Sequence, residues 1–224
     1  MYIKANGINM HYQKTGRGYP VVAIHGNGED GSIFAPLAAL LEDKCTVYAP
    51  DSRDHGESDK TVGELCYSDM AEDISSFIAA LNIKKPLLIG SSDGGIISLL
   101  TAINRPELIS GIVVCGANTK PSGIKLWPRL IMAAEYLAKR DKKIKLMLTQ
   151  PDITPESLGG IAVPSAILAG SEDLIKQRHT EKIAENIPNS KLFILEGETH
   201  TSYVIDNPQR LSEIVLEFID RLEG

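Results

Sequence analysis

The strongest constraint on this chain is the stretch 86–95, which reads PLLIGSSDGG. Its apolar start predicts a buried strand and residues 94–103 predict a helix, so the residues between them form a tight turn. Glycines two residues before and after Ser92 are needed there, because side chains would collide with the strand or the helix. The turn presents a serine hydroxyl beside a helix N-terminus, where backbone N–H groups can meet negative charge. Ser92 is therefore the predicted nucleophile, and the alternative is a helix-capping serine in a glycine-rich loop.

Strand-like and helix-like segments alternate along most of the chain. Two alternating segments around Asn6-Gly7 predict an antiparallel hairpin at the start. The apolar runs that predict buried strands are 20–24, 45–50, 86–89, 110–115, 163–169 and 191–195, and helical spacing appears at 32–41, 67–81 and 94–103. This order predicts an α/β fold with a mostly parallel central sheet, helices on both faces and an antiparallel N-terminal hairpin.

The length predicts one domain, 1–224, with a single sizeable core. The segment 118–154 interrupts the alternation with three prolines in a partly apolar helical stretch. It is predicted to be a small helical lid over the site, and the alternative is one or two surface helices. Trp127, Tyr136 and Phe34 are candidate substrate-pocket walls, with core packing as the alternative for each.

Composition limits the partners. The net charge of −6 is spread along the sequence, which predicts no nucleic-acid partner. The basic run 139–143 is predicted to be a solvated helix face or turn, with a phosphate site as the alternative. No apolar run is long enough to cross a bilayer and no signal-peptide pattern opens the chain, so we expect a cytoplasmic protein without a membrane partner.

The three cysteines, Cys45, Cys66 and Cys115, are odd in number and widely spaced, and no histidine lies at metal-ligand spacing from them. They are predicted to be reduced thiols. The sequence implies no metal and no organic cofactor, and it leaves the oligomeric state open.

An activated serine needs a base and an acid, and both follow later strands. Asp173 comes after the strand 163–169, and His200 comes after the strand 191–195. Because an open parallel sheet keeps its ligands at the carboxyl ends of its strands, Ser92, Asp173 and His200 are the predicted catalytic residues. Asp173 has alternatives, a helix cap or replacement by Glu172 as the carboxylate.

His200 also has an alternative, an ordinary surface loop histidine. Its rivals as the base have weaker positions. His11 lies in the opening hairpin, His55 in a loop before the Ser92 turn, His179 on a predicted helix face and His25 among glycines.

Four motifs in this order resemble the α/β-hydrolase fold family, and in particular its lid-bearing serine hydrolases. They are His25-Gly26, Asp51-x-Arg53-x-His55-Gly56-x-Ser58, the Ser92 turn and Gly197-x-x-His200. The resemblance spans nearly the whole chain. Relatives with a full lid carry a longer insertion than 118–154, and relatives that displace halide or open epoxides carry aspartate where this chain has Ser92.

The resemblance implies an oxyanion hole formed by the backbone N–H groups of Asn27 and Asp93. It also implies that Arg53 and His55 brace the neighbouring loop. The usual glycine before that histidine is replaced by Asp54, which puts the geometry of the loop in question.

Asp93 carries a second hypothesis. The sequence around Ser92 is similar to a branch of the family that includes hydrolases of amino-acid esters, and a carboxylate there would attract the ammonium of an α-amino ester. The alternative is that Asp93 only favours the first turn of a helix through the helix dipole.

Together these residues predict a serine hydrolase that cleaves a small carboxylic ester through an acyl-enzyme, with amidase activity less favoured. An acyltransferase or perhydrolase would use the same residues. The hypothesis of a different class is a non-catalytic receptor for a small ligand on the same fold.

Overall fold

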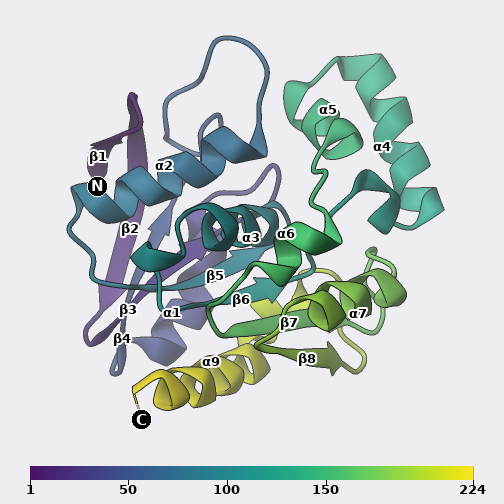
Figure 1. Ribbon diagram of the computed structural model, residues 1–224. Coiled ribbons are helices and arrows are strands. Elements are labelled where there is room, and N and C mark those ends of the chain that lie inside the picture. Colours follow the sequence, from purple (N-terminus) through teal and green to yellow (C-terminus); the bar gives the residue numbers. More distant parts are fainter. Residues whose placement is uncertain (224) are drawn as a thin grey trace.

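A single sheet organises the molecule. In the computed structural model, which describes residues 1–223, eight strands lie in the order β1-β2-β4-β3-β5-β6-β7-β8 (Figure 1). Strand β2 is antiparallel to both of its neighbours, and every other pair after it is parallel. The strands are β1 Tyr2–Ala5, β2 Ile8–Gly16, β3 Tyr19–Ile24, β4 Cys45–Pro50, β5 Leu87–Ser91, β6 Gly111–Cys115, β7 Ser165–Gly170 and β8 Ser190–Leu195. The predicted α/β fold class and its parallel sheet are confirmed.

The opening hairpin forms as the sequence predicts. Ala5 pairs with Ile8, which leaves Asn6 and Gly7 as a two-residue turn. Both turn residues have positive φ, 45° and 81°. A turn of this kind matches the twist of two antiparallel strands, and Asn-Gly is the dipeptide that adopts it most readily.

Helices cover both faces of the sheet. Side chains of α2, α3, α6 and α7 pack on one face, and those of α1 and α9 pack on the other. Their bounds are α1 Ala35–Leu41, α2 Tyr67–Ala80, α3 Asp93–Asn104, α6 Pro155–Gly159, α7 Gln177–Asn186, α8 Ser202–Ile205 and α9 Pro208–Glu223. Short 3-10 turns are η1 Gly31–Phe34, η2 Pro106–Leu108 and η3 Pro121–Gly123. Over residues 1–223, no helix combines the length and apolar composition needed to cross a bilayer.

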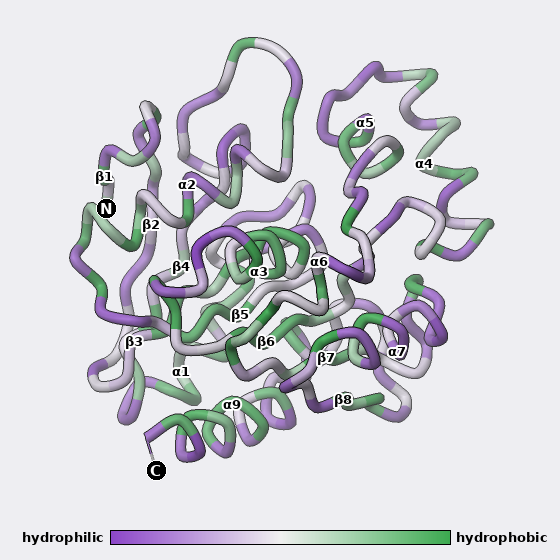
Figure 2. Tube along the Cα trace, in the orientation of Figure 1, coloured by the Kyte–Doolittle hydropathy of each residue, from purple (hydrophilic) through white to green (hydrophobic). Residues whose placement is uncertain are grey.

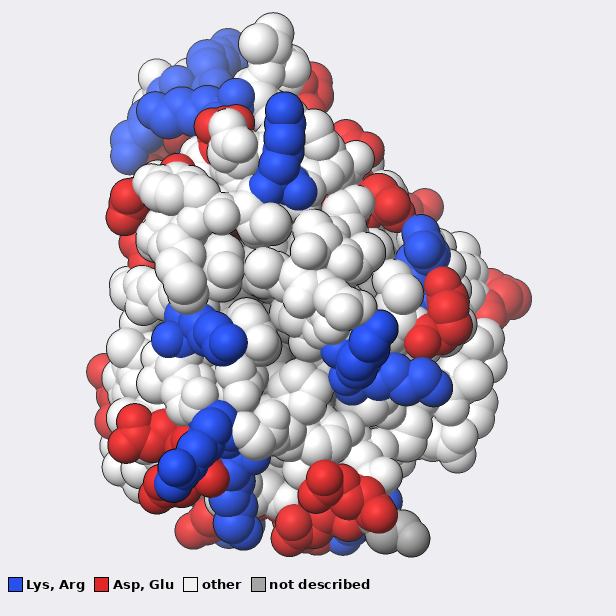
Figure 3. Space-filling view, turned by 90° about the vertical axis from the view of Figure 1, so that its left-hand side faces the viewer, with Lys and Arg blue, Asp and Glu red and all other residues white. Residues whose placement is uncertain are grey.

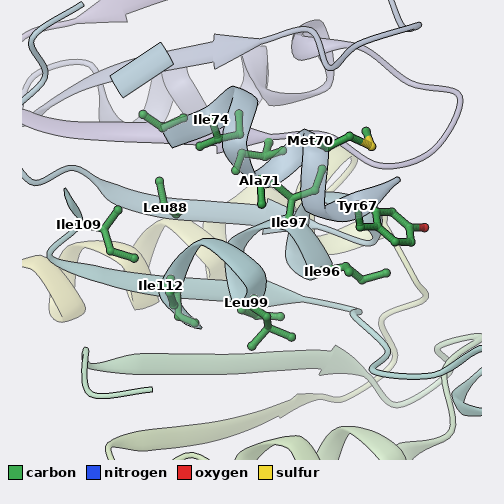
Figure 4. Close-up of a cluster of buried hydrophobic side chains, with 14 of the residues drawn as sticks. Tyr67, Met70, Ala71, Ile74, Leu88, Ile96, Ile97, Leu99, Ile109 and Ile112 are labelled. Atoms are coloured by element: carbon green, nitrogen blue, oxygen red, sulfur yellow. The ribbon is translucent and has the colours of Figure 1, made fainter. Parts of the chain in front are cut away.

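The core consists of two apolar layers that the sheet separates. Along β6, Ile112 and Val114 face one layer, whereas Val113 and Cys115 face the other. Figure 4 shows the layer between the sheet and helices α2 and α3, and Figure 2 shows that β5 and α3 are hydrophobic along most of their length. Because each fully buried aliphatic side chain contributes about 1.5–3 kcal/mol, these layers hold the strand ends in fixed positions.

The segment 118–154 leaves the body of the molecule after β6. It contains η3, α4 Leu126–Lys139 and α5 Lys142–Thr149, which stand to one side of the sheet (Figure 1). Helix α4 has no buried residue. An ion pair of 2.7 Å between Lys142 Nζ and Asp54 Oδ1 connects this segment to the rest of the protein.

The contact between Gly94 of α3 and the end of β3 generates a stability prediction. A Cβ on Gly94 would lie 1.9 Å from the carbonyl oxygen of Ile24, so Gly94→Ala requires the backbone to move. We expect it to lower the free energy of unfolding by about 1–3 kcal/mol or more, measured by urea denaturation. The control is Gly159→Ala, whose Cβ would meet nothing closer than the Asn186 oxygen at 3.8 Å. Equal stability of the two variants would contradict the account.

Candidate active site

The parallel strands bring the chemistry-bearing loops to one edge of the sheet. Strands β3, β5, β6, β7 and β8 point the same way, so the residues that follow their carboxyl ends lie near one another. These residues are Gly26, Ser92, Gly116, Asp173 and His200. Residues more than a hundred positions apart in sequence therefore meet in space.

Ser92 occupies the strained turn that the sequence predicts. Its φ and ψ are 52° and −113°, and it lies between the end of β5 and the start of α3. Its backbone N–H donates to Cys115 O at 2.8 Å, and its carbonyl accepts from Gly95 N at 2.9 Å. These bonds and the packed helix hold a backbone conformation that a non-glycine residue rarely adopts.

His200 connects Ser92 to Asp173. His200 Nε2 lies 2.9 Å from Ser92 Oγ, and His200 Nδ1 lies 2.7 Å from Asp173 Oδ1. Asp173 is 2% exposed, and its Oδ1 also accepts from Ile175 N at 2.8 Å, which fixes the carboxylate. Gly116 leaves room for the imidazole, because a Cβ there would lie 2.9 Å from two atoms of the ring. The geometry suits proton transfer from the hydroxyl to the imidazole.

The two backbone N–H groups expected to form an oxyanion hole flank Ser92. Asn27 follows β3 and Asp93 is the first residue of α3. Within residues 1–223, neither N–H donates to another protein group. Both Asn27 and Asp93 line the cavity that Ser92 faces.

The side chains of the same two residues bind each other. Asn27 Nδ2 donates to Asp93 Oδ2 at 2.9 Å and to the carbonyl of Lys143 on α5 at 3.2 Å. Burial raises the pKa of the Asp93 carboxyl, and the hydrogen bond from Asn27 opposes that rise. The Asp93 carboxylate in turn adds to the effect of burial in raising the pKa of Tyr67. Asn27 thus connects the nucleophile loop to the segment 118–154.

A cavity of about 210 Å³ opens beside Ser92. Its apolar walls come mainly from the segment 118–154 and the start of the loop after Asp173, and they are Ile124, Met132, Met147, Leu174 and Ile175. Its polar lining includes two carboxylates, Asp93 and Glu29, and no lysine or arginine. Burial raises the pKa of Glu29 as well, and its Oε2 accepts from Gly26 N at 2.9 Å.

Three predicted wall residues do not line this cavity. Phe34 is fully buried in the layer against α1, because it ends η1 on the opposite face of the sheet from α3. Trp127 is 74% exposed and points to solvent from α4. Tyr136 is half-buried under the guanidinium of Arg140, whose carbon lies 5.5 Å from the ring centroid. Helix α4 instead contributes Met132 to the cavity.

The second carboxylate of the cavity, Glu29, and the apolar residues of its wall were not predicted from the sequence. Glu29 lies two residues after Asn27, in the glycine-rich loop that follows a predicted strand. An acid in such a loop was the sequence signal that could have indicated a second carboxylate at the site. Met132 and Met147 carried no such signal, because aliphatic residues at helical spacing are equally typical of a core.

The loop after β4 contacts both the loop after β3 and helix α2. Arg53 Nε donates to Asp73 Oδ2 of α2 at 2.6 Å, as expected of a bracing residue. His25 Nε2 accepts from Ser52 N at 2.9 Å, and burial lowers the pKa of His25 to about 4, so it stays neutral. Asp54 keeps a positive φ of 64°, which explains how it replaces the usual glycine. Its carboxylate is the partner of Lys142 on α5.

Neither the cavity nor the rest of residues 1–223 contains three His, Cys, Asp or Glu side chains grouped as metal ligands. Cys45 and Cys115 are buried in strands, and no disulfide joins the described cysteines. Burial raises the pKa of Cys45 to about 11.

The raised pKa of Asp93 predicts a pH-dependent stability. The folded chain holds this proton more tightly than the unfolded chain, so stability from this group is full at low pH and is lost as pH rises through the raised pKa. Asp93→Asn removes that loss. The variant should gain free energy of unfolding relative to wild type as pH increases from 4 to 8, measured by urea denaturation.

The control is Asp43→Asn, since the Asp43 side chain is 92% exposed. Its difference from wild type should not change with pH. A pH-independent difference for Asp93→Asn would contradict the assignment of a buried, destabilised carboxylate.

Known proteins share the sequence family and the fold of this chain. The sequence model of the family described as alpha/beta hydrolase fold matches residues 19–142. An uncharacterized hydrolase of Bacillus subtilis, YugF, is 26% identical over 96% of this chain and 95% of its own length. The human serine hydrolase BPHL is 27% identical over 96% of this chain and 85% of its own length.

Solved structures show the same fold. A thermophilic esterase from Thermogutta terrifontis superposes with a TM-score of 0.82 at 20% identity, covering 100% of both chains. An enol-lactonase from Burkholderia xenovorans superposes with a TM-score of 0.83 at 20% identity, covering 98% of this chain and 100% of its own.

Proposed function

The chain belongs to the α/β-hydrolase fold family, and from that membership we propose that it is a serine hydrolase that cleaves small carboxylic esters through an acyl-enzyme. The observation that carries the proposal is the continuous chain of contacts from Ser92 through His200 to buried Asp173. Relatives whose names describe a serine hydrolase and an esterase support it.

In the proposed first step, Ser92 Oγ attacks the acyl carbon and gives its proton to His200 Nε2. The carbonyl oxygen becomes an oxyanion that accepts from the N–H groups of Asn27 and Asp93. His200 Nε2 then returns the proton to the departing alcohol oxygen, and an ester between Ser92 and the acyl group remains. Asp173 holds the imidazole in the required tautomer and stabilises the imidazolium.

In the second step, a water molecule attacks the acyl-enzyme while His200 accepts its proton. The same two N–H groups receive the second oxyanion. Collapse of this intermediate breaks the bond to Ser92 Oγ, which regains a proton from His200, and the carboxylic acid leaves.

The first test combines kinetics with covalent labelling. Ser92→Ala and His200→Ala should each lower kcat for p-nitrophenyl esters by about 10⁵-fold or more, and Asp173→Asn by about 10⁴-fold. A fluorophosphonate should modify wild type at Ser92 and fail to modify the His200→Ala variant. The control Ser122→Ala changes an exposed serine of the segment 118–154 and should match wild type.

Failure of the fluorophosphonate to label wild-type Ser92 would overturn the proposal and favour a non-catalytic receptor. Hydrolysis that persists in Ser92→Ala at the wild-type rate would show that another group does the chemistry.

We further propose that the substrate carries a positive charge close to its scissile carbonyl, as the ammonium of an α-amino ester does. Two observations support this. Asp93 and Glu29 both line a cavity whose lining contains no lysine or arginine. Their raised pKa values show that burial disfavours their charged forms, so a cationic substrate would relieve a cost that the free protein carries.

The charge proposal predicts a selective effect of Asp93→Asn. For α-amino esters kcat/KM should fall about 10- to 100-fold, because a hydrogen bond to a charged group is worth about 1.5–3 kcal/mol. For neutral esters of the same acyl size it should change less than about threefold, since the backbone N–H of residue 93 remains. Equal losses on both ester classes would contradict a recognition role.

The segment 118–154 is proposed to act as a small lid. It supplies Ile124, Met132 and Met147 to the cavity wall. Its contacts with Asn27 and Asp54 connect it to the two loops beside the nucleophile.

A further inference from the structure

Helix α4 exposes a continuous apolar face. The exposed residues between its start and Leu137 are all uncharged and lie at helical spacing on one side. The large ones are Leu126 (60% exposed), Trp127 (74%), Leu130 (47%), Ile131 (61%) and Leu137 (65%). Clustered side chains of this size are uncommon on a free surface and indicate an interaction site. Figure 2 shows hydrophobic turns on α4 although the helix lies at the periphery of the molecule.

Basic residues accompany this face. Residues 120–145 contain eight lysines and arginines against two acids, a net charge of +6. Three of these cations pair with acids outside the segment, namely Asp152, Asp54 and Glu64, so the segment together with these acids carries +3. On the side of the molecule shown in Figure 3, basic and acidic side chains are interspersed. Lys125 precedes α4, Arg129 lies within it and Arg140 follows it, and none of the three has an ion-pair partner among the described residues.

We propose that the exposed face of α4 is a docking surface for the anionic surface of a lipid bilayer. A helix with tryptophan and leucine on one face and lysine and arginine beside it lies in the interfacial plane of membranes, with the apolar side chains among the acyl chains. Each nearby lysine or arginine adds about fivefold in affinity for an anionic surface. The charge of the segment 120–145 matches that partner.

Charge also argues against a second copy as the occupant. A symmetric contact between two α4 faces would bring the unpaired cations of both copies, Lys125, Arg129 and Arg140, together, which is unfavourable at the short distances of an interface.

Docking would place the cavity near the bilayer, since the inner side of α4 supplies Met132 to the cavity wall. The proposal does not depend on the catalytic assignment, because it concerns the outer side of the helix. It replaces the sequence-based expectation of no membrane partner with peripheral binding.

Trp127 provides a direct readout, because it is the single tryptophan of the chain. Wild-type protein should bind vesicles of phosphatidylcholine with phosphatidylserine at least about tenfold more tightly than vesicles of phosphatidylcholine alone. Its emission should shift to shorter wavelength on binding, and raising the salt concentration should weaken the binding.

The variant Leu130→Gln, Ile131→Gln keeps the charge and should lose about tenfold or more in vesicle binding. Val62→Gln is the matched control, because Val62 is a fully exposed aliphatic residue outside α4. Lys125→Gln with Arg140→Gln should weaken binding only to anionic vesicles. Circular dichroism and hydrolysis of a water-soluble ester check that each variant is folded.

Three results would overturn the proposal. One is the absence of a Trp127 shift with anionic vesicles, and another is unchanged vesicle binding by Leu130→Gln, Ile131→Gln. The third is a Trp127 shift without vesicles that accompanies a concentration-dependent doubling of mass in sedimentation, which would assign the face to contacts between copies.

Discussion

The close approach of helix α3 to strands β3 and β5 is the contact on which the site depends. Gly90 and Gly94 allow it, since a Cβ on Gly94 would lie 1.9 Å from the Ile24 carbonyl oxygen and one on Gly90 would lie 2.1 Å from the Gly94 carbonyl oxygen. The turn between them holds Ser92 at a positive φ, and the two apolar layers beside the sheet supply the energy that keeps it there. The same contact brings Asn27 beside Asp93, because β3 ends where α3 begins.

The second constraint is the buried carboxylate of Asp93. A polar group that is almost fully buried needs hydrogen-bond partners, and Asn27 supplies one while also donating to the Lys143 carbonyl on α5. A single amide side chain therefore links the proposed oxyanion hole, the cavity carboxylate and the segment 118–154.

The segment 118–154 has two sides with different partners. Its inner side contributes Ile124, Met132 and Met147 to the cavity, whereas the outer face of α4 is apolar and uncovered. An uncovered apolar face adds no burial to the fold, which is why we propose a contact outside the molecule for it. The ion pair with Asp54 and the hydrogen bond from Asn27 both connect α5 to the rest of the protein. Neither contact buries the apolar side of α4.

The sequence by itself determined the strands, the opening hairpin, the turn at Ser92 and the position of Asp173 and His200 after successive strands. These follow from local signals, namely apolar runs, an Asn-Gly turn and glycines at fixed spacing, and from the rule that parallel strands end at one edge. Only the tertiary structure decided which side chains wall the cavity. Three apolar residues from helical segments illustrate this. Phe34 is in the core, Trp127 faces solvent and Met132 lines the cavity. The physical reason is that apolar periodicity indicates which residues share a face, whereas the packing of a helix against the body determines what that face meets.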